Sequence, residues 1–172
     1  MLVLRSFRLP EEYFNSVLAI GNFDGVHIGH QAVILEAKKI ARNNNSKLGI
    51  LTFEPHPKCF FKKKFNFFRL TPFRVKVEIL KSMGIDFLLN IKFDQKFVKN
   101  SAESFLKNFL NKSLKASHIV TGFDFVFGYR QSGDVKLIQE FSKRTRKFNF
   151  TEVKELKKNN VEISSSRIRN LL

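Results

Sequence analysis

The feature that most constrains the fold is a regular alternation of short apolar runs with amphipathic segments of helical period. Between the runs, apolar residues recur three and four positions apart, as Val33, Ala37 and Ile40 do. Strands separated by helices of this length form right-handed βαβ units. The expected fold is therefore α/β, a Rossmann-like parallel sheet with helices on both faces. The five predicted strands are residues 17–23, 47–53, 85–91, 117–122 and 148–153.

Local signals place the boundaries of the helices. Because prolines cannot continue a central strand, "EPHP" ends the second run, and we expect a loop from there to about Leu70. Thr71 can cap the next helix, with Pro72 at its first position and Gly84 at its end. Further helices are expected at residues 101–112, at 135–144 and at the end of the chain.

Composition is that of one packed domain. A chain of 172 residues, 43% of them hydrophobic and 21 of them Phe, is long enough to bury a core. No segment approaches the roughly 20 apolar residues that span a bilayer, and no signal peptide is evident. The single cysteine, Cys59, cannot form an internal disulfide, and no Cys/His spacing resembles a zinc site. We expect a cytoplasmic protein with no membrane partner.

The net charge points to an anionic ligand. With 31 Lys plus Arg against 15 Asp plus Glu, the chain carries a formal charge of +16. Such a charge suits nucleic acid, an acidic membrane or phosphate-rich small ligands, and does not choose among them. In residues 58–69, "KCFFKKKFNFFR", lysines alternate with phenylalanines and could stack bases and neutralise phosphates. A Lys-rich surface loop over buried aromatics is the commoner explanation, and we do not expect a nucleic-acid partner.

Four unusual motifs follow predicted strands. In parallel sheets ligands bind at the carboxyl ends of the strands, near a switch in strand order, so these motifs should meet in one site. "FEPHP" follows the second strand, "GFDFVFG" the fourth, and "SSSR" a short strand that ends near Ile163. The remaining motif, "GNFDGVHIGH", follows the first strand and begins a helix.

The histidines of this last motif suit phosphate chemistry. His27 and His30 lie three residues apart at a helix start, so their rings share one face, and Gly29 lets a phosphate chain approach. The helix N-terminus favours an anion, and imidazole donors can stabilise charge that develops on the oxygens of a pentavalent phosphorus. The alternative is a capped helix whose histidines only satisfy local backbone groups.

In their order and spacing the four motifs, with "RQSGD" after the third and the opening "LRSFRLP", closely resemble the adenylyltransferase domain of prokaryotic bifunctional FAD synthetases. The resemblance covers essentially the whole chain. It implies an α/β fold of the HxGH nucleotidyltransferase superfamily that transfers AMP from ATP to FMN, giving FAD and pyrophosphate with Mg²⁺. ATP and FMN are then the small-molecule partners, FMN and FAD being substrate and product.

The resemblance also implies residue roles. His27 and His30 would contact the ATP phosphates, and no residue is assigned as a dedicated metal ligand. The expected ATP-binding residues are Gly21, Asn22, Phe23, Gly25, His27, His30, Gly122, Asp124, Ser164, Ser165, Ser166 and Arg167. Of these, the expected catalytic residues are His27, His30, Ser164 and Arg167. The expected flavin-side residues are Pro55, His56, Pro57 and Phe60.

Some residues keep a second interpretation. Arg169 could hold the triphosphate or face solvent, and His56 could be a turn residue bonded to its own loop. Of Phe125 and Phe127, at least one is better explained by burial in the sheet than by ligand stacking. Phe123 and Val126 stand where relatives often have polar residues.

The domain expectation is a single FAD synthetase domain over residues 1–172, without the riboflavin kinase domain into which relatives continue. Three alternatives compete with this expectation. The first is another small HxGH nucleotidyltransferase that acts on pantetheine phosphate or a lipid head-group phosphate. The second is a non-catalytic, basic nucleic-acid-binding module. The third, a class I aminoacyl-tRNA synthetase fragment, is disfavoured because "SSSR" stands where a Lys-rich loop would be.

Overall fold

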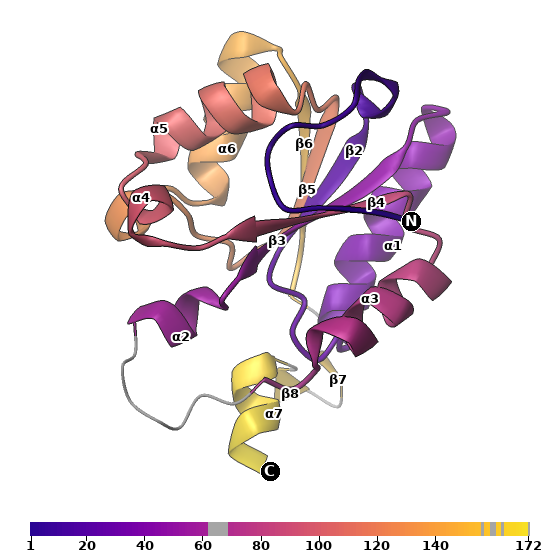
Figure 1. Cartoon of the computed structure of the whole chain (residues 1–172), viewed down its shortest axis with the longest axis vertical. Coiled ribbons are helices and arrows are strands. Elements are labelled where there is room, and N and C mark those ends of the chain that lie inside the picture. Colours follow the sequence, from indigo (N-terminus) through magenta and orange to yellow (C-terminus); the bar gives the residue numbers. More distant parts are fainter. Residues whose placement is uncertain (62–68, 156, 159–160, 163, 172) are drawn as a thin grey trace.

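A six-stranded parallel sheet with strand order β1-β4-β3-β2-β5-β6 forms the centre of the molecule (Figure 1). The computed structural model describes residues 1–61, 69–155, 157–158, 161–162 and 164–171. The strands of the sheet are β1 (Leu2–Leu4), β2 (Val17–Ile20), β3 (Leu48–Glu54), β4 (Phe87–Lys92), β5 (His118–Gly122) and β6 (Asn149–Val153). A separate antiparallel pair, β7 (Lys157–Lys158) and β8 (Val161–Glu162), precedes the last helix.

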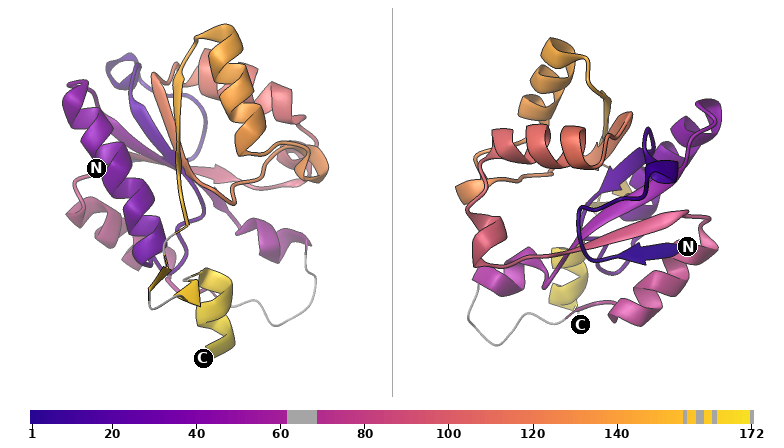
Figure 2. Two further views of the ribbon diagram at one scale, coloured as in Figure 1. Left: turned by 180° about the vertical axis from the view of Figure 1, so that it is seen from behind. Right: turned by 45° about the horizontal axis from the view of Figure 1, so that its top comes forward.

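Helices cover both faces of this sheet, which confirms the predicted fold class. Figures 1 and 2 show α1 (Ile28–Asn43) and α3 (Phe73–Ser82) on one face. The other face carries α5 (Ala102–Ser104), its π-helical continuation η2 (Phe105–Ser113), and α6 (Val135–Thr145). The remaining elements are η1 (Glu11–Tyr13), α2 (Pro57–Phe61), α4 (Gln95–Val98), η3 (Tyr129–Gln131) and α7 (Ser165–Leu171).

Two apolar clusters, one on each face, explain the continuous apolar runs of the sequence. Successive side chains of a strand point to opposite faces, so Leu18 and Ile20 pack with Phe105, whereas Val17 and Ala19 pack with Ile34. Every residue of β2 is buried. Among the described residues, no helix is long and apolar enough to cross a membrane.

The order in which successive strands are added to the sheet reverses at β2. The strands β2, β3 and β4 are laid down in one direction, and β5 then pairs with the other side of β2. The switch point therefore lies between β2 and β5. The turn that begins at Gly21 follows the carboxyl end of β2, and the segment after Gly122 follows the carboxyl end of β5. This is where ligands bind in open parallel sheets.

Several predicted boundaries were wrong. The first strand ends at Ile20 and not at residue 23, since Phe23, at a φ of 49°, already lies in the turn that continues through Gly25 at 85° and Val26 at 37°. The loop predicted after "EPHP" contains α2, while residues 62–68 of the Lys/Phe-rich segment lie outside the described residues, as does Ile163. The edge strand β1 was missed.

Two predicted helices also differ in detail. The N-cap of α3 is Pro72 and not Thr71, whose hydroxyl instead accepts a hydrogen bond from Gly25 N at 3.0 Å. The helix predicted over residues 101–112 is mostly π-helical, from Phe105 onward. Gly84, at φ +81°, ends α3 as expected.

Candidate active site

The two histidines of the first motif lie together at the start of α1. His27 is the N-cap, and its Nδ1 accepts a hydrogen bond from His30 N at 3.4 Å. The two rings stack with centroids 3.6 Å apart at 21°, and Phe23 packs edge-on against His30. His27 thus caps α1, as expected under the alternative in which the histidines satisfy local backbone groups. In the part of the chain that the structure describes, no residue bonds to its Nε2.

Burial keeps both imidazoles neutral. It lowers the pKa of His27, against the opposing carboxylates of Asp124 and Asp24. Burial, with the neighbouring His27 and Lys76, lowers the pKa of His30 to about 3. A neutral imidazole can still donate one N–H to a phosphate oxygen. His30 Nδ1 is buried and has no hydrogen-bond partner among the described residues.

Asp24 joins the turn to two distant segments. The residue is 4% exposed, and its carboxylate accepts hydrogen bonds from Leu70 N at 3.3 Å and Thr71 N at 3.1 Å. The same carboxylate forms an ion pair with Arg169, and the Asp24 carbonyl accepts a hydrogen bond from Ser165 Oγ at 2.8 Å. The turn after β2 is therefore fixed to the start of α3 and to α7.

The "SSSR" motif reaches the site through α7, whose helical start was predicted. Ser164 Oγ accepts a hydrogen bond from Arg167 N at 3.3 Å, and Ser166 Oγ accepts one from Lys58 Nζ at 2.8 Å. Arg167 is exposed, and its side chain forms no hydrogen bond or ion pair with the described residues. The side chain of Arg169 is only 8% exposed, so the interpretation in which it faces solvent was wrong.

The third motif approaches from β5. Asp124 is exposed but close enough to His27 to affect its pKa, so it lies on the same side of the switch point. Phe127 is 8% exposed and Phe125 is half-buried against the apolar cluster, which confirms that burial explains at least one of the two. Phe123, at 41%, is exposed.

The second motif lies on the β3 side of the site. Pro55 follows a cis peptide bond, and Pro57 begins α2. His56 Nδ1 accepts a hydrogen bond from Lys58 N at 3.1 Å, and burial lowers the pKa of His56 to about 4 against the effect of Asp24. Phe60 packs edge-on against Phe93, with ring centroids 5.4 Å apart.

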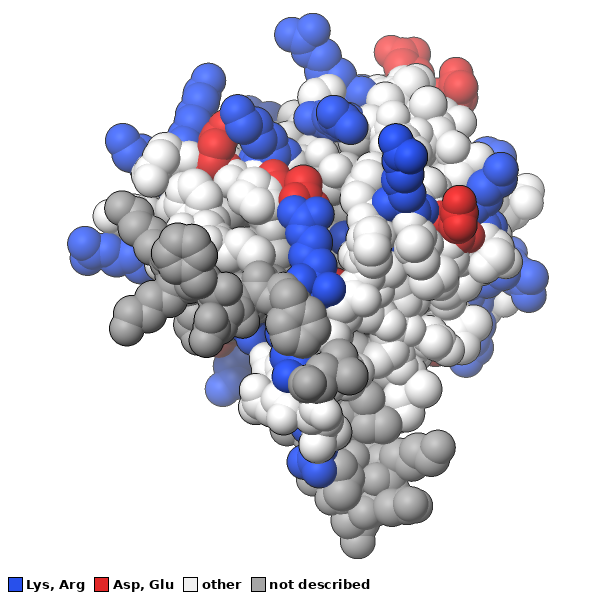
Figure 3. All heavy atoms as spheres, turned by 60° about the horizontal axis from the view of Figure 1, so that its bottom comes forward, with Lys and Arg blue, Asp and Glu red and all other residues white. Residues whose placement is uncertain are grey.

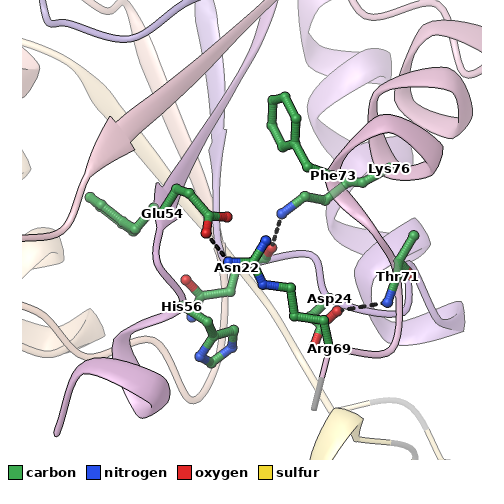
Figure 4. Close-up of a pocket in the computed structure, with 9 residues that line it drawn as sticks. Asn22, Asp24, Glu54, His56, Arg69, Thr71, Phe73 and Lys76 are labelled. Atoms are coloured by element: carbon green, nitrogen blue, oxygen red, sulfur yellow. Dashed lines mark hydrogen bonds and ion pairs between the residues drawn. The ribbon is translucent and has the colours of Figure 1, made fainter. Parts of the chain in front are cut away.

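Between these motifs the structure forms a pocket (Figure 4) whose polar lining the sequence analysis largely missed. Arg69 pairs with Glu54 across it, and Lys76 Nζ donates a hydrogen bond to Asn22 O at 3.1 Å. Its lining residues are Asn22, Asp24, Phe53, Glu54, His56, Arg69, Thr71, Phe73 and Lys76. Figure 3, viewed toward α7, shows more Lys and Arg than Asp and Glu side chains on this side of the molecule. The one signal in the sequence for Lys76 is its position four residues before Leu80, on the apolar stripe of α3.

A parallel sheet with its switch point beside a stacked histidine pair at a helix start defines an α/β domain of the nucleotidyltransferase type. Comparison with known proteins narrows this class. A sequence model described as FAD synthetase matches residues 9–167, and the chain belongs to that family.

Curated relatives agree with this assignment, and a solved structure shares the fold. A bifunctional riboflavin kinase/FMN adenylyltransferase of Buchnera aphidicola subsp. Schizaphis graminum is 40% identical over 92% of this chain and 51% of its own length. The Escherichia coli K12 protein of the same name is 35% identical over 95% of this chain and 51% of its own. A Streptococcus pneumoniae structure described as a macrolide-efflux protein superposes with a TM-score of 0.84 at 25% identity, covering 98% of this chain and 54% of that one. The chain spans about half the length of the curated relatives it matches.

Proposed function

We propose that this protein transfers AMP from ATP to the phosphate of FMN, forming FAD and pyrophosphate. The observation that carries the proposal is the pair of stacked, neutral histidines at the start of α1, beside a polar pocket whose lining includes Arg69 and Lys76. Membership of the FAD synthetase family supports FMN as the acceptor.

The chemistry of the proposal is a direct displacement. An oxygen of the FMN phosphate forms a bond to the α-phosphorus of ATP while the bond to the pyrophosphate oxygen breaks. The attacking phosphate is already ionised at neutral pH, so the step needs orientation and charge neutralisation more than a general base. The neutral imidazoles of His27 and His30 suit this step, because they donate hydrogen bonds to the α-phosphate oxygens without transferring a proton.

The remaining site residues keep proposed roles that fit their positions. The turn of Gly21, Asn22, Phe23 and Gly25 would approach the ATP phosphates; Asn22 Oδ1 is buried and has no hydrogen-bond partner in the described part of the chain. On the β5 side, Gly122 and Asp124 would face the adenosine. From α7, Ser164, Ser165, Ser166 and Arg167 would approach the triphosphate. On the flavin side, Pro55, His56, Pro57 and Phe60 would line the ring site.

Mg²⁺ belongs to the proposal as the counter-ion of the ATP phosphates. Such an ion takes most of its ligands from phosphate oxygens and water and needs only one or two protein carboxylates. Among the described residues, no three His, Cys, Asp or Glu side chains are grouped as a metal cage. Asp124, exposed beside His27, is a carboxylate available for this purpose.

Of the two activities in the relatives' names, we propose only FMN adenylyl transfer for this chain, because the FAD synthetase model matches residues 9–167. The riboflavin kinase activity belongs to those proteins as named. A cytoplasmic location is part of the proposal, since the reaction draws on ATP.

The test is a product assay with a panel of acceptors. The protein is incubated with ATP, Mg²⁺ and either FMN or pantetheine phosphate, and separately with CTP and a lipid head-group phosphate. FAD and pyrophosphate in equal amounts, from FMN alone, are expected. A folded protein that makes no FAD above background contradicts the proposal. Turnover of pantetheine phosphate or of the lipid head-group phosphate in place of FMN would assign the protein to the rival nucleotidyltransferase reaction. RNA binding that weakens steeply with salt, without turnover, would favour the binding module.

A further inference from the structure

Lys76 is a buried ammonium without a carboxylate partner. The residue is 6% exposed and occupies an apolar position on the inner face of α3. It forms no ion pair with any carboxylate of the described residues, whose pairs are Lys47–Asp86, Arg69–Glu54, Lys92–Asp94 and Arg169–Asp24. Burying an unpaired charge is costly, so a position of this kind calls for a specific reason.

Holding the turn does not supply that reason. Lys76 Nζ donates to Asn22 O at 3.1 Å, but Thr52 Oγ1 already donates to the same carbonyl at 3.2 Å. An ammonium has three donors, and only this one hydrogen bond uses them within the described residues. A Met or Leu at position 76 would satisfy the packing of α3 without the cost of a buried charge.

Among the described residues in and around this pocket, pairing of the charged groups leaves the positive charge of Lys76 without a counter-charge. Arg69 is paired with Glu54, and Asp24 is paired with Arg169. The neighbouring His56 and His30 have lowered pKa values, of about 4 and about 3, and are neutral at pH 7. Lys76 is thus the cation of this pocket that a bound anion would neutralise.

The position of Lys76 distinguishes between the two anionic substrates. Figure 4 shows its side chain pointing from α3 toward Asn22, in a pocket that Phe73, Glu54 and His56 also line. These walls come from β3, the segment after it and α3. The switch point, where Asp124 is close enough to His27 to affect its pKa, lies on the opposite side of β2. Under the proposed function, in which the segment after β3 faces the flavin, the pocket lies on the acceptor side of the turn and not on the adenosine side.

We propose that Lys76 binds the phosphate of the flavin acceptor and so holds the attacking oxygen beside the histidine pair. This inference rests on the proposed function. Because Lys76 would touch the monophosphate and not the ring, it would distinguish FMN from riboflavin, which differs only by that phosphate. The predicted specificity is therefore for phosphorylated acceptors.

The ionisation of Lys76 supports the same role. Burial, opposed by Asp24 and helped by Arg69, lowers its pKa to about 8. The other titratable groups around it are His30, His56 and Glu54. A phosphate dianion favours the charged amine and raises its pKa. FMN binding should then weaken as the pH rises above about 8, while riboflavin binding should not.

The experiment compares the dissociation constants of FMN and riboflavin, measured by quenching of flavin fluorescence, in the intact chain. In Lys76→Met, FMN affinity should fall about tenfold or more, the loss of one charge-assisted hydrogen bond, with riboflavin affinity within about twofold. Lys76→Arg should retain part of the preference for FMN. Lys81→Met, which removes an exposed lysine from the same helix, is the matched control and should change neither constant.

Three outcomes overturn the inference: an equal loss for both flavins, no loss for either, or a loss for ATP alone, which would assign Lys76 to the triphosphate. If Lys76→Met does not fold, the ratio of the two constants in the unaltered protein between pH 7 and 9.5 decides, and a flat ratio overturns the inference. A protein that makes FAD but fails these tests refutes the role of Lys76 alone. A protein that makes no FAD refutes the proposed function.

Discussion

Replacing Asp24 with Asn should loosen α7 before it unfolds the domain. Both members of the Asp24–Arg169 pair are buried, with side chains 5% and 8% exposed. Removing one charge from a buried pair typically costs about 3–5 kcal/mol, because the other charge stays buried. Asn can still accept one of the two hydrogen bonds from Leu70 N and Thr71 N, and losing the other adds about 1 kcal/mol.

The structure indicates where this cost appears. The seven-residue helix α7 contacts the turn through Asp24, which pairs with Arg169 and bonds to Ser165. Local opening costs less than global unfolding, so the free energy of docking α7 limits the loss. Hydrogen exchange of the amides of residues 165–171 should accelerate strongly in Asp24→Asn, with a smaller change in the urea midpoint.

Two further variants test the reasoning. Asp94→Asn is the control: its pair with Lys92 is exposed, and Asn still caps α4, so the urea midpoint should stay close to that of the unaltered protein. In the double variant Asp24→Asn/Arg169→Met, part of the loss should be recovered, because no uncompensated charge remains. Unchanged exchange in α7, or a double variant no more stable than Asp24→Asn, would refute this account of the buried pair.

The remaining predictions concern the histidines and one glycine. Ala at His27 or His30 should lower the rate of FAD formation by about 10²–10³-fold without loss of helical circular dichroism. The control is His118→Gln, at the amino end of β5 and bonded to Thr151, whose rate should stay within about twofold of the unaltered protein. Equal rates in all three variants would remove the histidine pair from the mechanism. The folded-state pKa values of His30 and His56, about 3 and about 4, lie below 6.5. As the pH falls below 6.5, these two imidazoles are therefore protonated in the unfolded chain before they are protonated in the folded one. The free energy of unfolding should then fall as the pH drops from 6.5 toward 4. The slope of that fall, measured by urea titration, should be shallower in His30→Gln/His56→Gln. Gly128→Ala should lower the free energy of unfolding by about 1 kcal/mol or more, because φ is +77° there and a Cβ would lie 2.6 Å from Ala102 N; a neutral result in urea would show that the loop can move away.

The order of strands and helices could be predicted because burial on both faces leaves a continuous apolar signature. Residues 48–53 and 87–91 are apolar except for Thr52 and Asn90, since each strand is covered by helices on both sides. β1 lacks this signature because it is a three-residue edge strand, none of whose residues is buried. The π-helical bonding of η2 also leaves no sign, because its apolar residues keep ordinary helical spacing.

The convergence of the motifs was predictable from the switch-point rule, but their contacts were not. Asp24 and Arg169 are 145 residues apart, and nothing local to either residue signals the pair. For Lys76 the sequence offered only a lysine on an apolar stripe, a pattern that exposed lysines near helix ends also produce. Long-range contacts of buried charges therefore need the structure.

The central claim is a single direct transfer of AMP to FMN, and the fate of labelled ATP tests it most directly. The protein is incubated with FMN, Mg²⁺ and ATP labelled either at the α- or at the γ-phosphorus, and the products are separated. The account predicts α-label in FAD, γ-label in pyrophosphate and no label on the protein. Label retained on the protein after denaturation, or γ-label in free phosphate without FAD, would contradict it.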